Sequence, residues 1–119
     1  MTVKPGGISI HCVDVARGRV AAGLRVRVAR LDGRVVCEGV VSAKGLLEEP
    51  ALMGEAITAG GYEVTFEVGA FYRALGIEVP DPAFLESVPY RFHIADVAQH
   101  YHLPFKFTAW GFSLFRGGA

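Results

Sequence analysis

The segment Leu24-Arg-Val-Arg-Val-Ala-Arg-Leu31 alternates apolar and charged side chains over most of its length. Successive side chains of a β-strand point to opposite faces, so a period of two is typical of a strand with one buried and one exposed face. The same alternation recurs at residues 62–68 and again at residues 90–95. The sequence therefore predicts a protein built from half-buried strands.

Turn sequences separate these strands at intervals that suit short β-strands. They are Gly18, Gly23, Asp32-Gly33, Lys44-Gly45, Gly60-Gly61 and Pro80-Asp81-Pro82. Asp-Gly between two alternating runs is a strong hairpin signal, because both residues tolerate the backbone angles of a tight turn. Only residues 51–56 and 70–75 suit a helix, and both stretches are short. Strands spaced at roughly 8–12 residues with turns between them predict an antiparallel β-sandwich.

The chain has 119 residues, the size of one domain, and no polar, featureless stretch divides it. We therefore predict a single domain over residues 1–119. Hydrophobic residues make up 51% of the chain, which is more than an isolated monomer of this size needs. Part of the apolar surface is expected to lie against another subunit.

The charge balance argues against two classes of partner. The 12 Lys and Arg residues balance the 12 Asp and Glu residues, so no net field attracts a nucleic acid or an anionic membrane surface. No apolar run is long enough to span a bilayer, and the first residues lack the apolar core of a secretory signal. We expect a soluble, cytoplasmic protein. Cys12 and Cys37 have no CxxC spacing, and we expect both to be free thiols.

The segment at residues 101–108 carries the strongest candidate site. Its odd-numbered positions are all apolar and share one face of the expected strand. Its even-numbered positions form a compact, largely polar face and are His102, Pro104, Lys106 and Thr108. A turn at residues 109–111 allows the last segment to pair back as a hairpin. This pairing would bring Ser113 and Phe115 beside the face that carries His102.

Four histidines, at positions 11, 93, 100 and 102, are the main candidates for chemistry. Histidine takes and gives a proton near neutral pH, so a pair of histidines can activate a water molecule. The alternative is that each histidine is an ordinary surface or core residue. His100 and His102 have a spacing that permits metal binding, but the sequence offers no third ligand beside them, so we predict no metal site. The sequence also has no phosphate-binding glycine loop and no serine in a nucleophile elbow.

Several motifs resemble those of one enzyme family. They are Ile8-Ser-Ile-His-Cys-Val-Asp-Val-Ala-Arg-Gly-Arg-Val-Ala-Ala-Gly-Leu24, Tyr62-Glu-Val-Thr-Phe-Glu-Val-Gly69, Val88-Pro-Tyr-Arg-Phe-His-Ile-Ala-Asp96, His100-Tyr-His-Leu-Pro104 and Phe115-Arg-Gly-Gly118. In order and spacing they are similar to motifs of the 5-hydroxyisourate hydrolases, the transthyretin-related enzymes of urate breakdown. The resemblance covers nearly the whole chain.

The resemblance implies an all-β, transthyretin-like antiparallel sandwich of two sheets with one short helix. It implies a homotetramer, a dimer of dimers, with the site in a channel between the dimers. Enzymes of this family need no cofactor and hydrolyse an N–C(O) bond of 5-hydroxyisourate, a small purine-derived substrate, to give 2-oxo-4-hydroxy-4-carboxy-5-ureidoimidazoline. By position, His11 and His102 match the catalytic histidines of the family, while Arg116 and Gly117 fall in its C-terminal Tyr-Arg-Gly-Ser motif.

The chain departs from the family pattern at three places. Leu46 stands where the family carries a substrate-binding Arg, Phe115 replaces the Tyr of the terminal motif, and Lys106 occupies a position that is usually apolar. We expect the substrate to be bound by Leu46, Lys106, Ser113, Phe115, Arg116 and Gly117.

These departures leave three hypotheses open. A less polar pocket favours a modified substrate, such as an N-methylated hydroxyisourate. Alternatively, Lys44 or Lys106 takes the place of the missing Arg and the ordinary reaction survives with a raised KM, because lysine lacks the planar fork of arginine. The third hypothesis is a non-catalytic, transthyretin-like protein that binds a small ligand.

Overall fold

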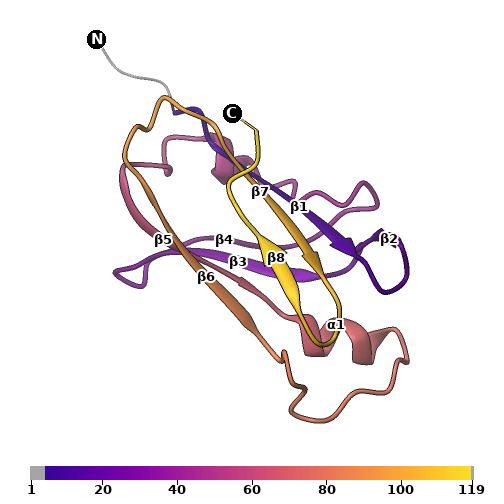
Figure 1. Ribbon diagram of the computed structural model, residues 1–119. Helices are drawn as coiled ribbons and strands as arrows, with labels where there is room; N and C mark the ends of the chain where they lie inside the picture. Colours follow the sequence, from indigo (N-terminus) through magenta and orange to yellow (C-terminus); the bar gives the residue numbers. More distant parts are fainter. Residues whose placement is uncertain (1–4, 119) are drawn as a thin grey trace.

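Two four-stranded β-sheets face each other in the computed structural model of the chain, which describes residues 5–118 (Figure 1). The first sheet has the strand order β2 (Arg19–Val20), β1 (Ile8–Asp14), β7 (Tyr101–Phe107) and β8 (Phe112–Leu114). The second has the order β4 (Val35–Val40), β3 (Arg25–Arg30), β5 (Gly60–Phe66) and β6 (Val88–Ile94). The prediction of a two-sheet β-sandwich is confirmed.

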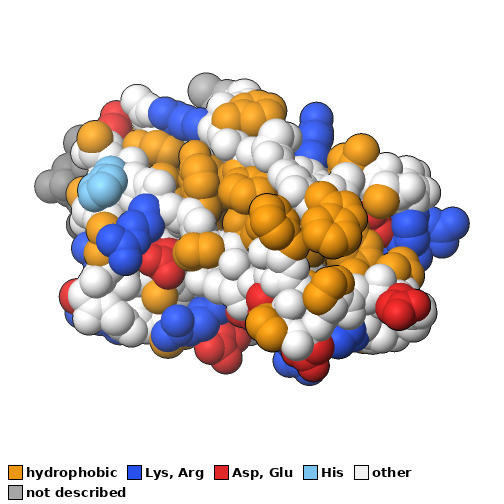
Figure 2. Space-filling view, turned by 60° about the horizontal axis from the view of Figure 1, so that its bottom comes forward, with side chains coloured by type: hydrophobic (Ala, Val, Ile, Leu, Met, Phe, Trp, Pro, Cys, Tyr) orange, Lys and Arg blue, Asp and Glu red, His pale blue; other side chains and the backbone are white. Residues whose placement is uncertain are grey.

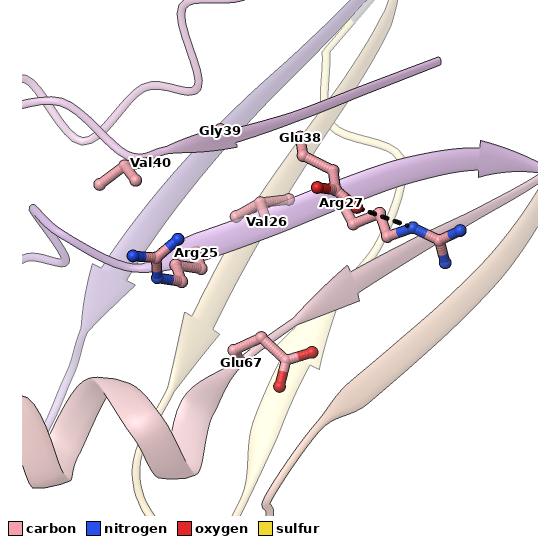
Figure 3. A pocket seen from close by; sticks show the side chains of 7 residues that line it. All are labelled: Arg25, Val26, Arg27, Glu38, Gly39, Val40 and Glu67. Atoms are coloured by element: carbon pink, nitrogen blue, oxygen red, sulfur yellow. Dashed lines mark ion pairs between the residues drawn. The ribbon is translucent and has the colours of Figure 1, made fainter. Parts of the chain in front are cut away.

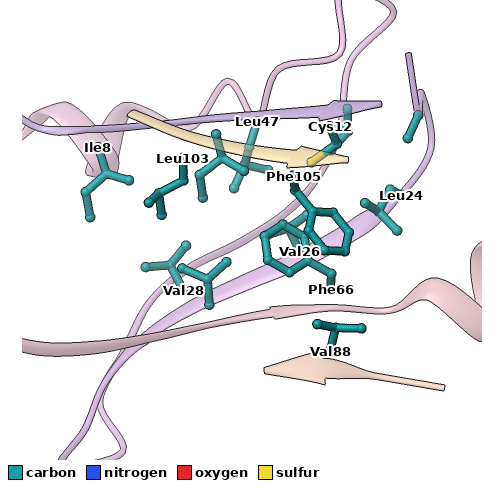
Figure 4. Close-up of a cluster of buried hydrophobic side chains, with 14 of the residues drawn as sticks. Ile8, Cys12, Leu24, Val26, Val28, Leu47, Phe66, Val88, Leu103 and Phe105 are labelled. Atoms are coloured by element: carbon teal, nitrogen blue, oxygen red, sulfur yellow. The ribbon is translucent and has the colours of Figure 1, made fainter. Parts of the chain in front are cut away.

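The core lies between the sheets and is made by the alternating apolar positions of both (Figure 4). At its centre the rings of Phe66 and Phe105 stack with their centroids 3.9 Å apart, which joins β5 of one sheet to β7 of the other. Cys12 lies in the same layer, and its burial raises the pKa of the thiol to about 12. Cys12 and Cys37 are both free thiols.

The predicted Asp32-Gly33 hairpin is confirmed, since it joins the antiparallel strands β3 and β4. Gly33 has φ +95°, a conformation that glycine adopts without steric cost. Of the two predicted helices, the second is α1 (Val68–Ala74), whereas the first is only the 3₁₀ turn η1 (Pro50–Met53). The strand expected at residues 62–68 ends at Phe66, because α1 begins at Val68.

One pairing differs from the antiparallel arrangement that the sequence predicted. β1 pairs with β7 in parallel along its whole length, from Ile8 beside Tyr101 to Asp14 beside Phe107. The other strand pairs of both sheets are antiparallel, including the predicted hairpin of β7 and β8, in which Lys106 lies opposite Ser113. A parallel pair needs no tight turn between its strands, and here most of the chain separates the two.

A buried carboxylate fixes the far end of this strand pair. Asp14 is fully buried at the end of β1. Its side chain accepts hydrogen bonds from Arg17 Nε at 2.5 Å and from the Tyr72 hydroxyl at 2.8 Å. Because Tyr72 belongs to α1, this contact ties the helix to the sheet formed by β1 and β7.

Within residues 5–118, no helix has the length and apolar character that a membrane span requires.

Candidate active site

The outer face of the β1–β7 pair carries two of the sequence-predicted histidines. On β1 the residues Ile8, Ile10 and Cys12 are buried in the core, so the intervening Ser9 and His11 point outward. On β7 the same alternation turns His102 outward, and the parallel register places it beside Ser9. His11 lies two positions further along, which puts the Cα atoms of the two histidines roughly 8 Å apart by strand geometry.

His102 belongs to a continuous chain of hydrogen bonds. Its Nδ1 atom lies 2.6 Å from the Oγ atom of Ser9. The same Oγ atom lies 2.8 Å from Nε2 of His100, and Nδ1 of His100 lies 2.7 Å from the carbonyl oxygen of Gly6. A carbonyl oxygen only accepts, so Nδ1 of His100 carries a proton and donates it. The Nε2 atom of His102 is not part of this chain.

The pKa of His102 is lower than that of an ordinary histidine. Partial burial is the largest cause, since it disfavours the charged imidazolium, and the nearby His11 and His100 add to the effect. His102 is therefore held in its neutral form at neutral pH. A neutral imidazole is the form that can take a proton from water.

Two glycines pack against the two histidines. Gly45 has φ +81°, and a Cβ atom at this position would lie 2.8 Å from Nε2 of His11. The backbone N–H of Gly117 donates to the carbonyl oxygen of His102 at 2.7 Å. A Cβ atom at Gly117 would lie 2.7 Å from Cδ2 of the His102 ring. Both imidazoles thus lie against backbone that has no room for a side chain.

Comparisons with known proteins show the family to which the chain belongs. Residues 8–117 match the model of the HIUase/Transthyretin family. The chain belongs to this family. A protein of Rhizobium meliloti (strain 1021) named 5-hydroxyisourate hydrolase 2 is 38% identical over 117 residues, which cover 96% of this chain and 98% of that protein.

Two solved structures are similar over nearly the whole chain. The structure of Klebsiella pneumoniae 5-hydroxyisourate hydrolase gives a TM-score of 0.80 at 30% identity and covers 95% of this chain and 99% of that one. The crystal structure of an (S)-allantoin synthase gives a TM-score of 0.87 at 33% identity and covers 97% of this chain but 44% of that one. The predictions of a transthyretin-like fold and of an enzyme resembling 5-hydroxyisourate hydrolase are confirmed.

The other sequence-predicted site residues of this family member lie around the histidines at different distances. Leu46 forms an isolated antiparallel bridge with His11, so it borders the site directly. Lys106 is exposed on the same face as His102, but four residues along a strand correspond to about 13 Å. Ser113 lies opposite Lys106 in the β7–β8 hairpin. Lys106 forms no ion pair with any of residues 5–118.

The C-terminal segment folds back over the start of β7. Its Arg116 donates from Nη2 to the side-chain oxygen of Gln99 at 2.9 Å and to the carbonyl oxygen of His100 at 3.1 Å. The guanidinium also lies 4.1 Å above the centre of the Tyr101 ring. Arg116 thus holds Gly117 against His102. Phe115 is 49% exposed.

The sheet formed by β4, β3, β5 and β6 has a hollow of about 460 Å³ on its outer face (Figure 3). Its lining contains no histidine and no nucleophile, and two of its charged residues, Arg27 and Glu38, pair at 3.2 Å. This hollow therefore offers no group that moves a proton near neutral pH, whereas His11 and His102 lie together on the β1–β7 face. Within residues 5–118, no three His, Cys, Asp or Glu side chains are grouped to hold a metal ion.

One residue of the hydrogen-bond chain escaped the sequence analysis. Ser9 was not singled out, whereas His100 was named among the four candidate histidines and as a possible metal ligand. The alternation of β1 already puts Ser9 and His11 on one face, and this was the available signal. The sequence could not show that β1 lies beside β7, which brings Ser9 into contact with both histidines.

The pKa of His102 can be measured directly. We expect NMR titration of its imidazole Cε1–H signal to give a pKa below the ordinary value of 6.5. Replacing His11 with Gln removes one of the groups that lower this pKa, so the His102 pKa should rise in that variant. A wild-type pKa at or above 6.5 would contradict the electrostatics described here.

Proposed function

We propose that this protein is a hydrolase that opens the oxidised purine ring of 5-hydroxyisourate or of a modified analogue. The observation that carries the proposal is the pair His11 and His102 on one outer face, with the pKa of His102 lowered. The relatives named 5-hydroxyisourate hydrolase support the substrate class, because the similarity to them extends over nearly the full length of the chain.

His102 acts as the general base in the proposed reaction. Its Nε2 atom takes a proton from water while the water oxygen bonds to a ring carbonyl carbon of the substrate. The resulting tetrahedral intermediate carries a negative oxygen, which nearby donors and cations stabilise. Collapse of the intermediate breaks the N–C(O) bond and leaves a carboxylic acid on one side and an N–H group on the other.

His11 is the partner of His102 in this scheme. It lies on the neighbouring strand, two positions further along the same face, and borders the substrate space beside Leu46. We assign it to orienting the attacking water or to protonating the leaving nitrogen. Close packing against Gly45 restricts the position of its ring.

The test is to generate 5-hydroxyisourate in situ from urate and to follow its ultraviolet decay. Wild-type protein should accelerate the decay beyond the uncatalysed rate. His102→Ala should lower the rate by a factor on the order of 10² to 10⁴, which is the usual contribution of a general base. His93→Ala is the matched control, because His93 is an exposed histidine of the other sheet.

No acceleration by the wild-type protein would reject this hydrolase activity on 5-hydroxyisourate. The modified analogues would then be assayed. If these also failed, the non-catalytic binding protein would become the better interpretation. The replacement of the family Arg by Leu46 favours that alternative, because an unpaired polar group of a bound substrate costs about 1–3 kcal/mol.

Leu46 also suggests which substrate the site prefers. An apolar side chain beside His11 removes hydrogen-bonding partners and offers surface to a methyl group. We therefore extend the proposal to an N-methylated hydroxyisourate.

The preference should be visible in kcat/KM. We expect an N-methylated analogue to be favoured over 5-hydroxyisourate by about tenfold, the effect of one well-buried methyl group. Leu46→Arg should reverse this preference. Equal kcat/KM values for the two compounds in the wild-type protein would exclude a selective role for Leu46.

Lys106 is proposed to take the place of the family arginine at whose position this chain has Leu46. It is exposed on the face of His102, opposite Ser113, and the outward positions of β1 and β7 carry no acidic residue. Lys44 lies in an exposed turn, where its backbone N–H donates to the Ser42 hydroxyl, and it is kept as the alternative substitute. We also propose that four further residues contact the substrate. Ser113 lies beside Lys106 on this face, and the C-terminal segment that folds back over the start of β7 carries Phe115, Arg116 and Gly117.

Lys106→Met tests this assignment. The variant should raise KM about fivefold with little change in kcat, because an exposed charge contributes up to about 1 kcal/mol of binding. Steady-state kinetics at low ionic strength would measure the change. An unchanged KM would remove Lys106 from the site.

We further propose that the protein is a homotetramer. Figure 2 shows a band of hydrophobic side chains across one face of the molecule. Large apolar residues are exposed at the β8 end of the fold, with Phe84 70% and Trp110 64% exposed and their ring centroids 5.8 Å apart. Exposed aromatic surface of this kind is typical of subunit interfaces.

A further inference from the structure

We propose that Ser9 and His100 are positioning residues that hold His102 in a single tautomer, with the proton on Nδ1 and the lone pair on Nε2. The inference rests on the proposed hydrolase function, because it concerns the base of that reaction. It assigns roles to two residues that lie beside the reacting atoms without touching them.

The chain of hydrogen bonds has a fixed starting point at the backbone. The carbonyl oxygen of Gly6 can only accept, so Nδ1 of His100 is the donor of their 2.7 Å bond. In the neutral form of His100, which has a single ring proton, Nε2 carries none and accepts. The Ser9 hydroxyl therefore donates to His100 across the 2.8 Å contact.

The direction of the next bond then follows. A hydroxyl has one proton, and Ser9 has already used it on His100. Its Oγ atom can only accept from His102, across the 2.6 Å contact with Nδ1. His102 therefore carries its proton on Nδ1 and presents a free lone pair on Nε2. This is the tautomer that can remove a proton from water.

The surroundings of His102 restrict its ring as well as its proton. Gly117 donates its N–H to the His102 carbonyl oxygen, and its α-carbon lies against the Cδ2 edge of the ring. Ser9 is the direct neighbour of His102 in the parallel register. One side of the imidazole is thus held by β1 and another by the C-terminal segment. Nε2 remains the ring atom without a partner in this network.

The charged side chains near this hydrogen-bond chain do not themselves orient the His102 ring. Arg116 approaches His100 only through the backbone carbonyl oxygen. The side chain of Asp96 accepts from the backbone of Ala98 and from Gln99, in the turn before β7. Neither contacts the Ser9 hydroxyl, so no carboxylate in this network orients His102 in the manner of a serine-protease triad. The Ser9 hydroxyl and the His100 imidazole occupy the position that the carboxylate has in such a triad.

The first test reads the tautomer without using activity. Two-dimensional ¹H–¹⁵N NMR of the full-length protein at pH 8 distinguishes a protonated Nδ1 from a protonated Nε2. We expect His102 to be protonated on Nδ1 in the wild-type protein and to shift towards the Nε2–H form in Ser9→Ala. A wild-type His102 protonated on Nε2 would overturn the proposal, as would an unchanged tautomer in Ser9→Ala.

The second test separates positioning from substrate binding. Ser9→Ala and His100→Ala should each lower kcat by roughly tenfold, the effect of one lost hydrogen bond, with KM nearly unchanged. Ser9→Thr keeps the hydroxyl and should restore both kcat and the tautomer. His93→Ala should leave both readouts at the wild-type value, and circular dichroism would verify that each variant is folded.

The two tests also separate this inference from the proposed function. If the protein does not hydrolyse hydroxyisourates, the hydrolase proposal fails and the NMR result alone judges the tautomer. If activity depends on His102 while Ser9→Ala retains full kcat and the same tautomer, the hydrolase stands and the positioning role is wrong. A fall in kcat that Ser9→Thr does not restore would also reject it.

Discussion

The parallel pairing of β1 with β7 is the constraint on which the site depends. It places residues from opposite ends of the chain side by side, with Ser9 next to His102. The pairing is held from within, because the inward side chains of both strands belong to one core and Phe105 of β7 stacks on Phe66 of the opposite sheet. Burial of the inward positions fixes which residues point outward. The histidines therefore point outward because the apolar residues that alternate with them are buried in the core.

Much of this fold could be predicted from residues close together in the sequence. The period of two identified the strand-forming regions, and Asp32-Gly33 identified one hairpin, because both signals are local. Strand neighbours were harder to predict. Periodicity shows which face of a strand is buried, but it does not show which other strand lies beside it, so the sequence could not predict the parallel β1–β7 pair within the otherwise antiparallel sandwich.

The same limit explains what the sequence showed of the site. His102 was singled out from the polar face of its strand, and the resemblance paired it with His11; the structure places the two histidines on one face. Ser9 was missed, since a serine in a strand has no significance until its neighbour is known. Gly45 was read as a turn residue, which its φ of +81° supports, but its contact with His11 depends on tertiary structure.

The chain of contacts beside His102 contains no acidic residue, and this has a chemical consequence. A carboxylate partner would stabilise the charged imidazolium and raise the pKa of His102, whereas a hydroxyl orients the ring without adding charge. The nearby His11 and His100 act in the opposite direction to a carboxylate, since they lower the pKa of His102 together with burial. The site therefore combines a fixed tautomer with a weakly basic, neutral imidazole. Such a base suits a reactive cyclic amide, because the neutral imidazole is ready to take the proton of the attacking water.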